Sequence, residues 1–169
     1  MRIEQTIITD ISIVEKIYTE AIAYQHHQTG YSWYPFSSSF IKQEIEEKRN
    51  FKVVTDEDEI AGVFSVMNVD PIIWNDDKGK EAIYLHRMAI LNNYRGKNIA
   101  KRVVEWAMIE AFKCKKKFIR IDTWASNKKL ITYYQNLGFR LIGKKQLPPK
   151  SNLPAHYNNI EVSLFEIKL

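Results

Sequence analysis

The stretch from Asn92 to Phe112 places a basic, glycine-containing turn directly before an amphipathic helix. In the helical part, apolar residues recur at spacings of three and four, as one buried helix face requires. The first turn of a helix leaves backbone N–H groups unpaired at the positive end of the dipole, and Arg95, Lys97 and Lys101 add charge there. We therefore predict a phosphate-binding turn. The alternative is a solvated connection in which Gly96 only allows a tight turn.

Two well-known phosphate loops differ from this turn. A Walker loop requires an earlier glycine and a Ser or Thr after Gly-Lys, whereas Leu91 and Asn98 occupy those positions. The dinucleotide fingerprint requires three glycines, and this turn contains only Gly96. We expect neither ATP with magnesium nor NAD as the ligand.

The turn resembles the acyl-CoA loop of the GNAT superfamily of N-acyltransferases, which reads Arg or Gln, two residues, Gly, one residue, then Gly or Ala. Arg95 and Ala100 match its ends, whereas Asn98 replaces the inner glycine. Asparagine can adopt left-handed dihedrals, but it brings a side chain close to the ligand. A second segment, Asn127–Phe139, resembles the family's Asn-to-Tyr-to-Gly-Phe segment, so the resemblance covers residues 84–139 well.

The resemblance implies one α/β domain over residues 1–169, with a mixed, largely antiparallel twisted sheet of about six to seven strands, helices on both faces and a splayed central strand pair. Sequence patterns predict strands at Arg2–Thr9, Phe51–Thr55, Ile60–Val69, Glu81–Ile90, Phe118–Thr123, Arg140–Gln146 and Ile160–Lys168. They predict further helices from Asp10 to about Tyr24, from a cap at Ser37, Ser38 or Ser39 to about Arg49, and after Asn127.

The resemblance also implies how acetyl-CoA binds. The backbone of Met88, Ala89 and Ile90 would pair with the pantetheine arm, and one of their N–H groups would polarise the thioester carbonyl. The other implied contacts are Arg95, Gly96, Lys97, Asn98, Ile99, Ala100, Lys101, Asn127, Leu130 and Tyr134. Asn127 is also a natural N-cap for its helix.

The expected reaction requires an acid and a way to remove a proton. An alkylamine has a pKa of about 10, so it must lose a proton before it attacks. The oxyanion then needs a fixed donor, and the thiolate leaving group benefits from an acid. Tyr134, four residues before Gly138, matches the family's acid tyrosine, with Tyr133 as the alternative and core packing as the other role for Tyr134.

The proton acceptor has several candidates. Tyr84 and His86 are expected to share one face of their strand with Met88 and Ile90, and Asp122 is out of place in an apolar strand, where a carboxylate needs a partner or a function. We name His86 and Asp122 as catalytic candidates, each acting directly or through water. Alternatively His86 is hydrogen-bonded structure, or positioning alone supplies most of the rate.

The segment from His26 to Phe36 is unusually aromatic and is expected to be a loop. We expect Trp33 and Phe36 to pack, and we name Tyr31, Tyr34 and Tyr84 as candidate substrate contacts. His26 and His27 have no further ligand at suitable spacing, so no metal site is expected. His156 and Tyr157, in a proline-containing loop, could also border the acceptor.

Composition sets the broad class. A chain of 169 residues with 45% hydrophobic content suits one core. The single Cys114 excludes an intramolecular disulfide, and the sequence start lacks an apolar signal region, which together favour a cytoplasmic setting. The net charge of +5 and the run Lys113–Lys117 would suit nucleic acid, but we interpret the run as a solvated helix end and the surplus as steering for anionic CoA.

These observations predict an N-acetyltransferase that moves an acetyl group from acetyl-CoA to a primary amine by direct attack. A protein N-terminus, a lysine or a small amine would all suit the chemistry. The alternative is a non-catalytic acyl-CoA-binding module or sensor, suggested by Asn98, and a nucleic-acid binder is the third reading. We expect a monomer or homodimer without nucleic-acid or membrane partners.

Overall fold

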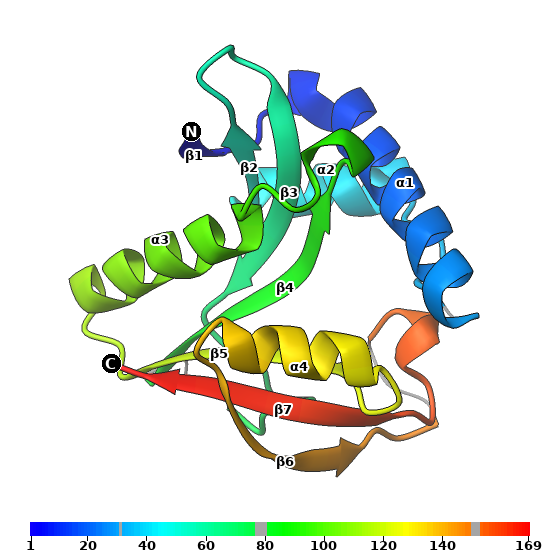
Figure 1. Cartoon of the computed structure of the whole chain (residues 1–169), viewed down its shortest axis with the longest axis vertical. Helices are drawn as coiled ribbons and strands as arrows, with labels where there is room; N and C mark the ends of the chain where they lie inside the picture. Colours follow the sequence, from blue (N-terminus) through cyan, green and yellow to red (C-terminus); the bar gives the residue numbers. More distant parts are fainter. Residues whose placement is uncertain (31, 77–80, 150–152) are drawn as a thin grey trace. The chain divides into compact units, whose positions relative to one another are not determined.

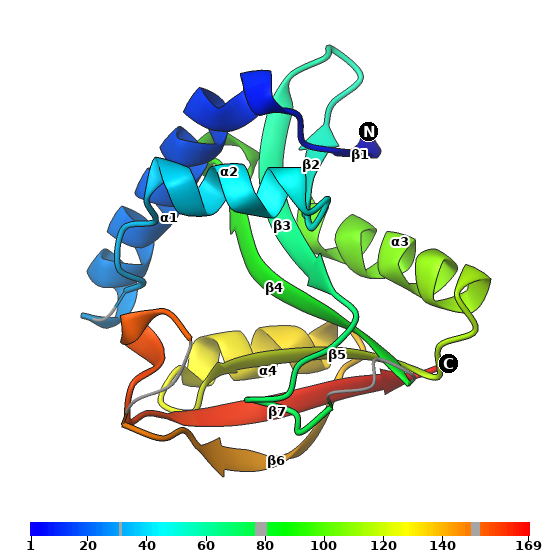
Figure 2. The same cartoon turned by 180° about the vertical axis from the view of Figure 1, so that it is seen from behind.

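The computed structural model describes residues 1–30, 32–76, 81–149 and 153–169 (Figure 1, Figure 2). The helices are α1 (Ile11–Thr29), α2 (Ser38–Glu46), α3 (Ile99–Lys113) and α4 (Lys128–Asn136). The strands are β1 (Arg2–Gln5), β2 (Asn50–Val54), β3 (Ile60–Met67), β4 (Ala82–Ile90), β5 (Phe118–Trp124), β6 (Arg140–Gln146) and β7 (Glu161–Lys168). Short 3₁₀ turns occupy Ile8–Asp10, Asn92–Tyr94 and Ala155–Tyr157.

The strands form a seven-stranded mixed sheet in the order β1-β2-β3-β4-β5-β7-β6. Strands β4 and β5 are parallel, while β1–β2, β2–β3, β5–β7 and β6–β7 are antiparallel. The parallel register runs from Ala82 opposite Phe118 to Leu85 opposite Ile121, yet β4 continues to Ile90 and β5 to Trp124. The mixed sheet and the central pair that separates after four residue pairs confirm the predicted fold.

The chain forms two compact units that share two elements. Unit 1 contains residues 1–66 and 87–103, and unit 2 contains residues 67–86 and 104–169. Strand β4 passes from unit 2 into unit 1 after His86, and helix α3 passes from unit 1 into unit 2 after Val103. Each unit has its own buried core.

In unit 1, helices α1 and α2 supply an apolar layer with an aromatic cluster. The Tyr18 ring lies 6.3 Å from Trp33 and 4.8 Å from Phe36, measured between centroids, and Phe36 stacks on Phe40 at 5.4 Å. The backbone N–H of Trp33 donates to Gln25 Oε1 at 3.0 Å. The prediction that Trp33 and Phe36 pack is therefore confirmed.

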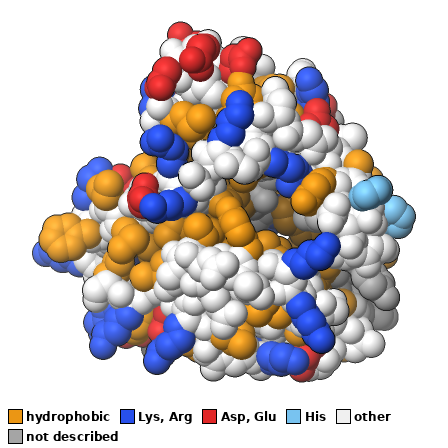
Figure 3. Space-filling model, viewed as in Figure 1, with side chains coloured by type: hydrophobic (Ala, Val, Ile, Leu, Met, Phe, Trp, Pro, Cys, Tyr) orange, Lys and Arg blue, Asp and Glu red, His pale blue; other side chains and the backbone are white. Residues whose placement is uncertain are grey.

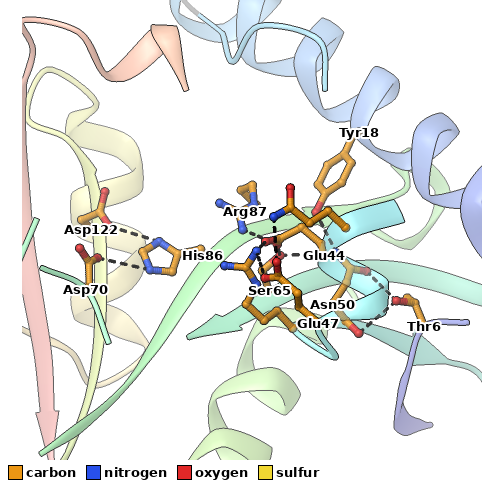
Figure 4. Close-up of polar contacts among 12 residues, drawn as sticks. Thr6, Tyr18, Glu44, Glu47, Asn50, Ser65, Asp70, His86, Arg87 and Asp122 are labelled. Carbon is orange, nitrogen blue, oxygen red and sulfur yellow. Dashed lines mark hydrogen bonds and ion pairs between the residues drawn. The ribbon is translucent and has the colours of Figure 1, made fainter. Parts of the chain in front are cut away.

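A polar network lies beneath this layer, centred on the buried carboxylate of Glu44 (Figure 4). Glu44 accepts hydrogen bonds from Ser65 Oγ at 2.7 Å and from the Arg87 guanidinium, and its other oxygen lies 2.9 Å from Arg49. Asn50 extends the network by donating to the hydroxyl of Tyr18 at 3.2 Å. The network links α1, α2, β2, β3 and β4 within unit 1.

Gly62 in β3 marks a close approach to β4. A Cβ at this position would lie 2.7 Å from the carbonyl oxygen of Ala89, which is backbone and cannot rotate away. We expect Gly62→Ala to lower the free energy of unfolding by about 1–3 kcal/mol, the usual cost of overpacking. Chemical denaturation measures the free energy of unfolding of each variant. Gly143→Ala in β6 is the control, because a Cβ at Gly143 meets no atom within 4 Å. An equal effect of the two substitutions would contradict this assignment.

In unit 2, helix α4 packs on one face of β5 and β7 (Figure 1, Figure 2). Tyr134 of α4 makes edge contacts with Phe139 at 6.0 Å and with Phe165 of β7 at 5.7 Å. A second cluster contains buried Ile73, Leu147, Tyr157 and Val162, with Trp74, Trp124, Leu153, Ile160 and Leu164 packed against it. Ile73 and Trp74, in the segment after β3, therefore form part of the core.

Three predicted boundaries were wrong. Helix α1 continues to Thr29 instead of ending near Tyr24, because polar Gln25–Gln28 are compatible with a helix and the left-handed Gly30, at φ 74°, provides the stop. Strand β1 ends at Gln5, since Asp10 accepts from the Ile7 N–H and forms a 3₁₀ turn. Helix α2 is capped by Ser37, which is one of the three serines predicted as caps. It ends at Glu46 instead of near Arg49.

Acidic side chains gather at the tip of the β2–β3 hairpin in unit 1 (Figure 3). Among the described residues, no helix combines the length and the apolar character needed to cross a bilayer.

Candidate active site

The basic turn in unit 1 has the backbone that the phosphate-binding hypothesis requires. Gly96 and Asn98 both adopt left-handed dihedrals, at φ 76° and φ 59°. Asn98 therefore reproduces the conformation for which glycine is usually selected. Its carbonyl accepts from the Arg102 N–H at 3.2 Å, so α3 begins directly after it and the N–H groups of the first helical turn have no intrahelical acceptor.

Side chains of unit 1 hold the cations of this turn in place. The guanidinium of Arg95 lies 3.6 Å above the ring of Tyr24 and donates to Asn92 Oδ1 at 3.0 Å. Partial burial lowers the pKa of Arg95 from its ordinary value, but a guanidinium remains charged at neutral pH. Lys97 Nζ lies 4.7 Å above the Tyr94 ring. The turn thus presents two cations whose side chains are already partly ordered.

Strand β4 carries an irregularity at Arg87, which has φ 50° in the middle of the strand. A left-handed residue interrupts the period-two alternation of a strand. Tyr84 and His86 share a face as predicted, but the alternation does not extend across Arg87 to Met88 and Ile90. The side chain of Arg87 is 8% exposed and lies 5.2 Å above the Phe40 ring.

In unit 2, His86 lies between two carboxylates (Figure 4). Its Nε2 is 3.4 Å from Asp70 Oδ2, and its Nδ1 is 3.7 Å from Asp122 Oδ1. All three side chains are at most 6% exposed. Asp122 follows Ile121, the last residue of β5 in register with β4, and His86 follows Leu85. The next position of the same parallel register brings His86 opposite Asp122. The two predicted catalytic candidates are therefore neighbours.

Asp70 is a member of this cluster that the sequence analysis missed. It follows β3 in a turn that contains Pro71, and no spacing rule connects it to His86. Asp70, His86 and Asp122 offer one nitrogen and two oxygens within 4.8 Å, which is a possible donor set for a divalent metal. However, the two carboxylates face different ring nitrogens, whereas one ion would bind only one of them. This arrangement suits proton handling better than metal ligation.

Tyr134 is the buried member of the tyrosine pair in α4. It is 8% exposed, whereas Tyr133 is 42% exposed. Burial is the main cause that raises the pKa of Tyr134, and the negative charge of Asp122 raises it further. The phenol therefore stays protonated at neutral pH and is electrostatically coupled to the carboxylate beside His86.

The remaining predicted contacts have varied surroundings. Asn127 caps α4, since its Oδ1 accepts from the Leu130 N–H at 3.1 Å. Tyr34 is 59% exposed, and Tyr31 lies outside the described residues. Tyr84 is fully buried, and its hydroxyl donates to Asp76 at 2.7 Å and accepts from Arg120 at 3.1 Å. We therefore assign Tyr84 a structural role in place of the predicted substrate contact.

Comparison with known proteins identifies the class. The pattern described as the Acetyltransferase (GNAT) family matches residues 14–139. A curated relative, the uncharacterized N-acetyltransferase YesJ of Bacillus subtilis, is 31% identical over 101 residues, which span 57% of this chain and 56% of that relative. The chain belongs to the acetyltransferase (GNAT) family.

Solved structures share the fold. A GNAT-family acetyltransferase from Listeria monocytogenes is 21% identical with a TM-score of 0.75, over 99% of this chain and 94% of that one. The structure of yncA from Salmonella typhimurium with its cofactor acetyl-CoA is 15% identical with a TM-score of 0.70, over 100% of this chain and 94% of that one. At these identities the likeness establishes the fold alone.

Proposed function

We propose that the protein transfers an acetyl group from acetyl-CoA to a primary amine. The observation that carries this proposal is the turn of unit 1, where Asn98 adopts the left-handed conformation and Arg95 is held on Tyr24. Family membership and the acetyl-CoA bound to the Salmonella relative support the same co-substrate. The cytoplasm suits a chain whose one cysteine, Cys114, is a free, exposed thiol.

The turn and β4 would bind the nucleotide thioester. The N–H groups that begin α3, with Arg95, Lys97 and Lys101, would bind the pyrophosphate, because oriented N–H dipoles and cations both attract anions. The backbone of Met88–Ile90 would pair with the pantetheine and donate to the thioester oxygen. Asn127 and Leu130, at the start of α4, remain the proposed pantetheine contacts of unit 2.

The side chains of unit 2 would move the protons. His86 takes one proton from the substrate ammonium, with Asp122 stabilising the imidazolium. The free amine nitrogen attacks the thioester carbon, and the C–S bond breaks. Tyr134 gives its proton to the departing sulfur and regains one from the nitrogen, which becomes the amide. His86 returns its proton to solvent, so one proton is released per turnover.

Two alternatives are separated by simple measurements. A non-catalytic acyl-CoA-binding module would bind acetyl-CoA without releasing thiol in the presence of any amine. A nucleic-acid binder would be retained on DNA at low salt and released as salt rises. For the proposed enzyme, residues 1–169 would act as one domain, and the protein would be a monomer or a homodimer.

Thermal unfolding with and without acetyl-CoA tests the proposed co-substrate. Acetyl-CoA at about 100 times its dissociation constant should stabilise the native protein by about 2.7 kcal/mol and raise the midpoint by several degrees. Arg95→Ala should remove most of this rise, because it deletes the ordered cation, whereas Lys113→Ala at the other end of α3 should keep it. A midpoint that does not respond at millimolar acetyl-CoA would refute the proposal.

A further inference from the structure

We propose that Glu20 and Tyr24 of helix α1 are positioning residues for the turn that binds the diphosphate of acetyl-CoA. Glu20 ties the start of the turn to α1, and Tyr24 holds the guanidinium of Arg95 on its ring. The inference rests on the proposed function, because the diphosphate belongs to the proposed co-substrate. It assigns a favourable role to a carboxylate beside a site for an anion, where charge alone would predict weaker binding.

Helix α1 presents both side chains from one firmly packed face. Glu20 and Tyr24 are four residues apart in α1, so they are neighbours on the helix surface. Ile17 and Ala21, on the adjoining stripe, are 0% and 4% exposed and hold this part of α1 in the core of unit 1. The helix therefore provides a rigid support for the two side chains.

Glu20 satisfies the first backbone donor of the turn. The 3₁₀ turn Asn92–Tyr94 follows Leu91, whose apolar side chain makes no cap hydrogen bond. Glu20 Oε2 accepts from the Asn92 N–H at 3.2 Å instead. Because the two residues are 72 positions apart, this cap comes from the tertiary fold of unit 1 and has no local sequence signal.

Asn92 and Tyr24 together order Arg95. Asn92 Oδ1 accepts from Arg95 Nε at 3.0 Å, and the guanidinium carbon lies 3.6 Å from the centroid of the Tyr24 ring. These contacts use Nε and one face of the guanidinium, so its two NH₂ groups remain for phosphate oxygens. Burial lowers the pKa of Arg95, and the nearby Tyr24 and Glu20 oppose that shift. The cation is therefore held in place before any ligand binds.

Two effects of Glu20 on acetyl-CoA binding have opposite signs. Its negative charge repels the diphosphate, but water and salt screen this repulsion at a partly exposed site. Its hydrogen bond fixes the turn, so a ligand that binds Arg95 does not also have to immobilise a long side chain. We expect the second effect to exceed the first.

Substitutions of Glu20 separate the hydrogen bond from the charge. Glu20→Gln keeps an oxygen acceptor and removes the charge, so its Kd for acetyl-CoA should equal the wild-type value or be up to about threefold lower. Glu20→Ala removes both, and its Kd should rise about tenfold. Isothermal titration calorimetry without an acceptor amine measures each Kd. Glu15→Ala is the matched control, since it removes the same charge from α1 but Glu15 pairs with Ser38, and its Kd should stay within about twofold.

Substitutions of Tyr24 test the stacked cation in the same titrations. Tyr24→Leu removes the ring and should raise the Kd for acetyl-CoA about fivefold. Tyr24→Phe keeps the ring, and its Kd should stay within about twofold of the wild-type value.

The donor S-acetylpantetheine, which has the thioester but no diphosphate, distinguishes positioning from a general loss of structure. Glu20→Ala and Tyr24→Leu should raise KM for acetyl-CoA, keep kcat within about twofold and leave kcat/KM for S-acetylpantetheine unchanged. Binding of acetyl-CoA to Glu20→Ala as tight as to the wild type, or equal losses with the two donors, would overturn the inference. A wild-type protein that binds no acetyl-CoA would instead refute the proposed function, and the inference with it.

Discussion

Tyr134→Phe is expected to lower kcat by about 10²-fold and to leave KM for acetyl-CoA nearly unchanged. The substitution removes one hydroxyl and keeps the ring, whose edge contacts with Phe139 and Phe165 hold α4 on β7. Without the Tyr134 hydroxyl, the sulfur of CoA must leave as an unprotonated thiolate. The transition state is then no longer stabilised by proton donation to the sulfur. The effect should therefore appear in the chemical step.

The pH dependence follows from the environment of this tyrosine. Burial and the charge of Asp122 raise the pKa of Tyr134 above its usual value of about 10, so its acid form persists at neutral and moderately alkaline pH. The wild-type rate should rise with pH as a larger fraction of the acceptor amine loses its proton. It should show no falling limb from Tyr134 below about pH 10.

Tyr133→Phe is the matched control. Tyr133 is the next residue, is 42% exposed and lies 6.2 Å from Tyr134 between ring centroids. Released thiol, followed by steady-state kinetics over a range of pH, should show near wild-type turnover for Tyr133→Phe. If Tyr134→Phe turns over at the wild-type rate throughout, or Tyr133→Phe is the impaired variant, the assignment of the acid is wrong.

The sequence predicted the secondary-structure elements that carry the candidate site, because their signals are local. The turn before α3, the cap at Asn127 and the strand bearing His86 each follow from residue types within a few positions. Asn98 is an example. The turn requires a left-handed conformation at this position, and asparagine tolerates that conformation. The fold followed from the resemblance and from the order of these elements.

What the sequence could not predict depends on contacts between distant segments. Asp70 and Asp122 flank His86 only because β4 and β5 are in parallel register and the turn after β3 is folded back. The left-handed Arg87 has no local signal, since arginine rarely adopts this conformation. Its partner Glu44 lies 43 positions earlier in the sequence, so no local pattern connects the two residues.

Glu44→Ala is expected to lower the free energy of unfolding by about 3–5 kcal/mol, the largest stability effect that we predict. The carboxylate is 3% exposed and compensates the Arg87 guanidinium, which is 8% exposed. Removing it leaves a buried cation and strips Ser65 of its acceptor. Arg87 is itself the left-handed residue of β4, so the loss of its partner should loosen β4 next to Met88–Ile90.

Glu47→Ala separates this effect from the loss of any acidic residue near Arg49. Glu47 also pairs with Arg49, but its side chain is 44% exposed, so its removal should cost less than about 1 kcal/mol. Urea unfolding measures both variants. The double variant Glu44→Leu with Arg87→Met removes both charges, and it should recover much of the loss, because an apolar pair of similar volume needs no compensation. If the single and double variants are equally destabilised, the cost comes from packing, and the buried ion pair is not what stabilises β4.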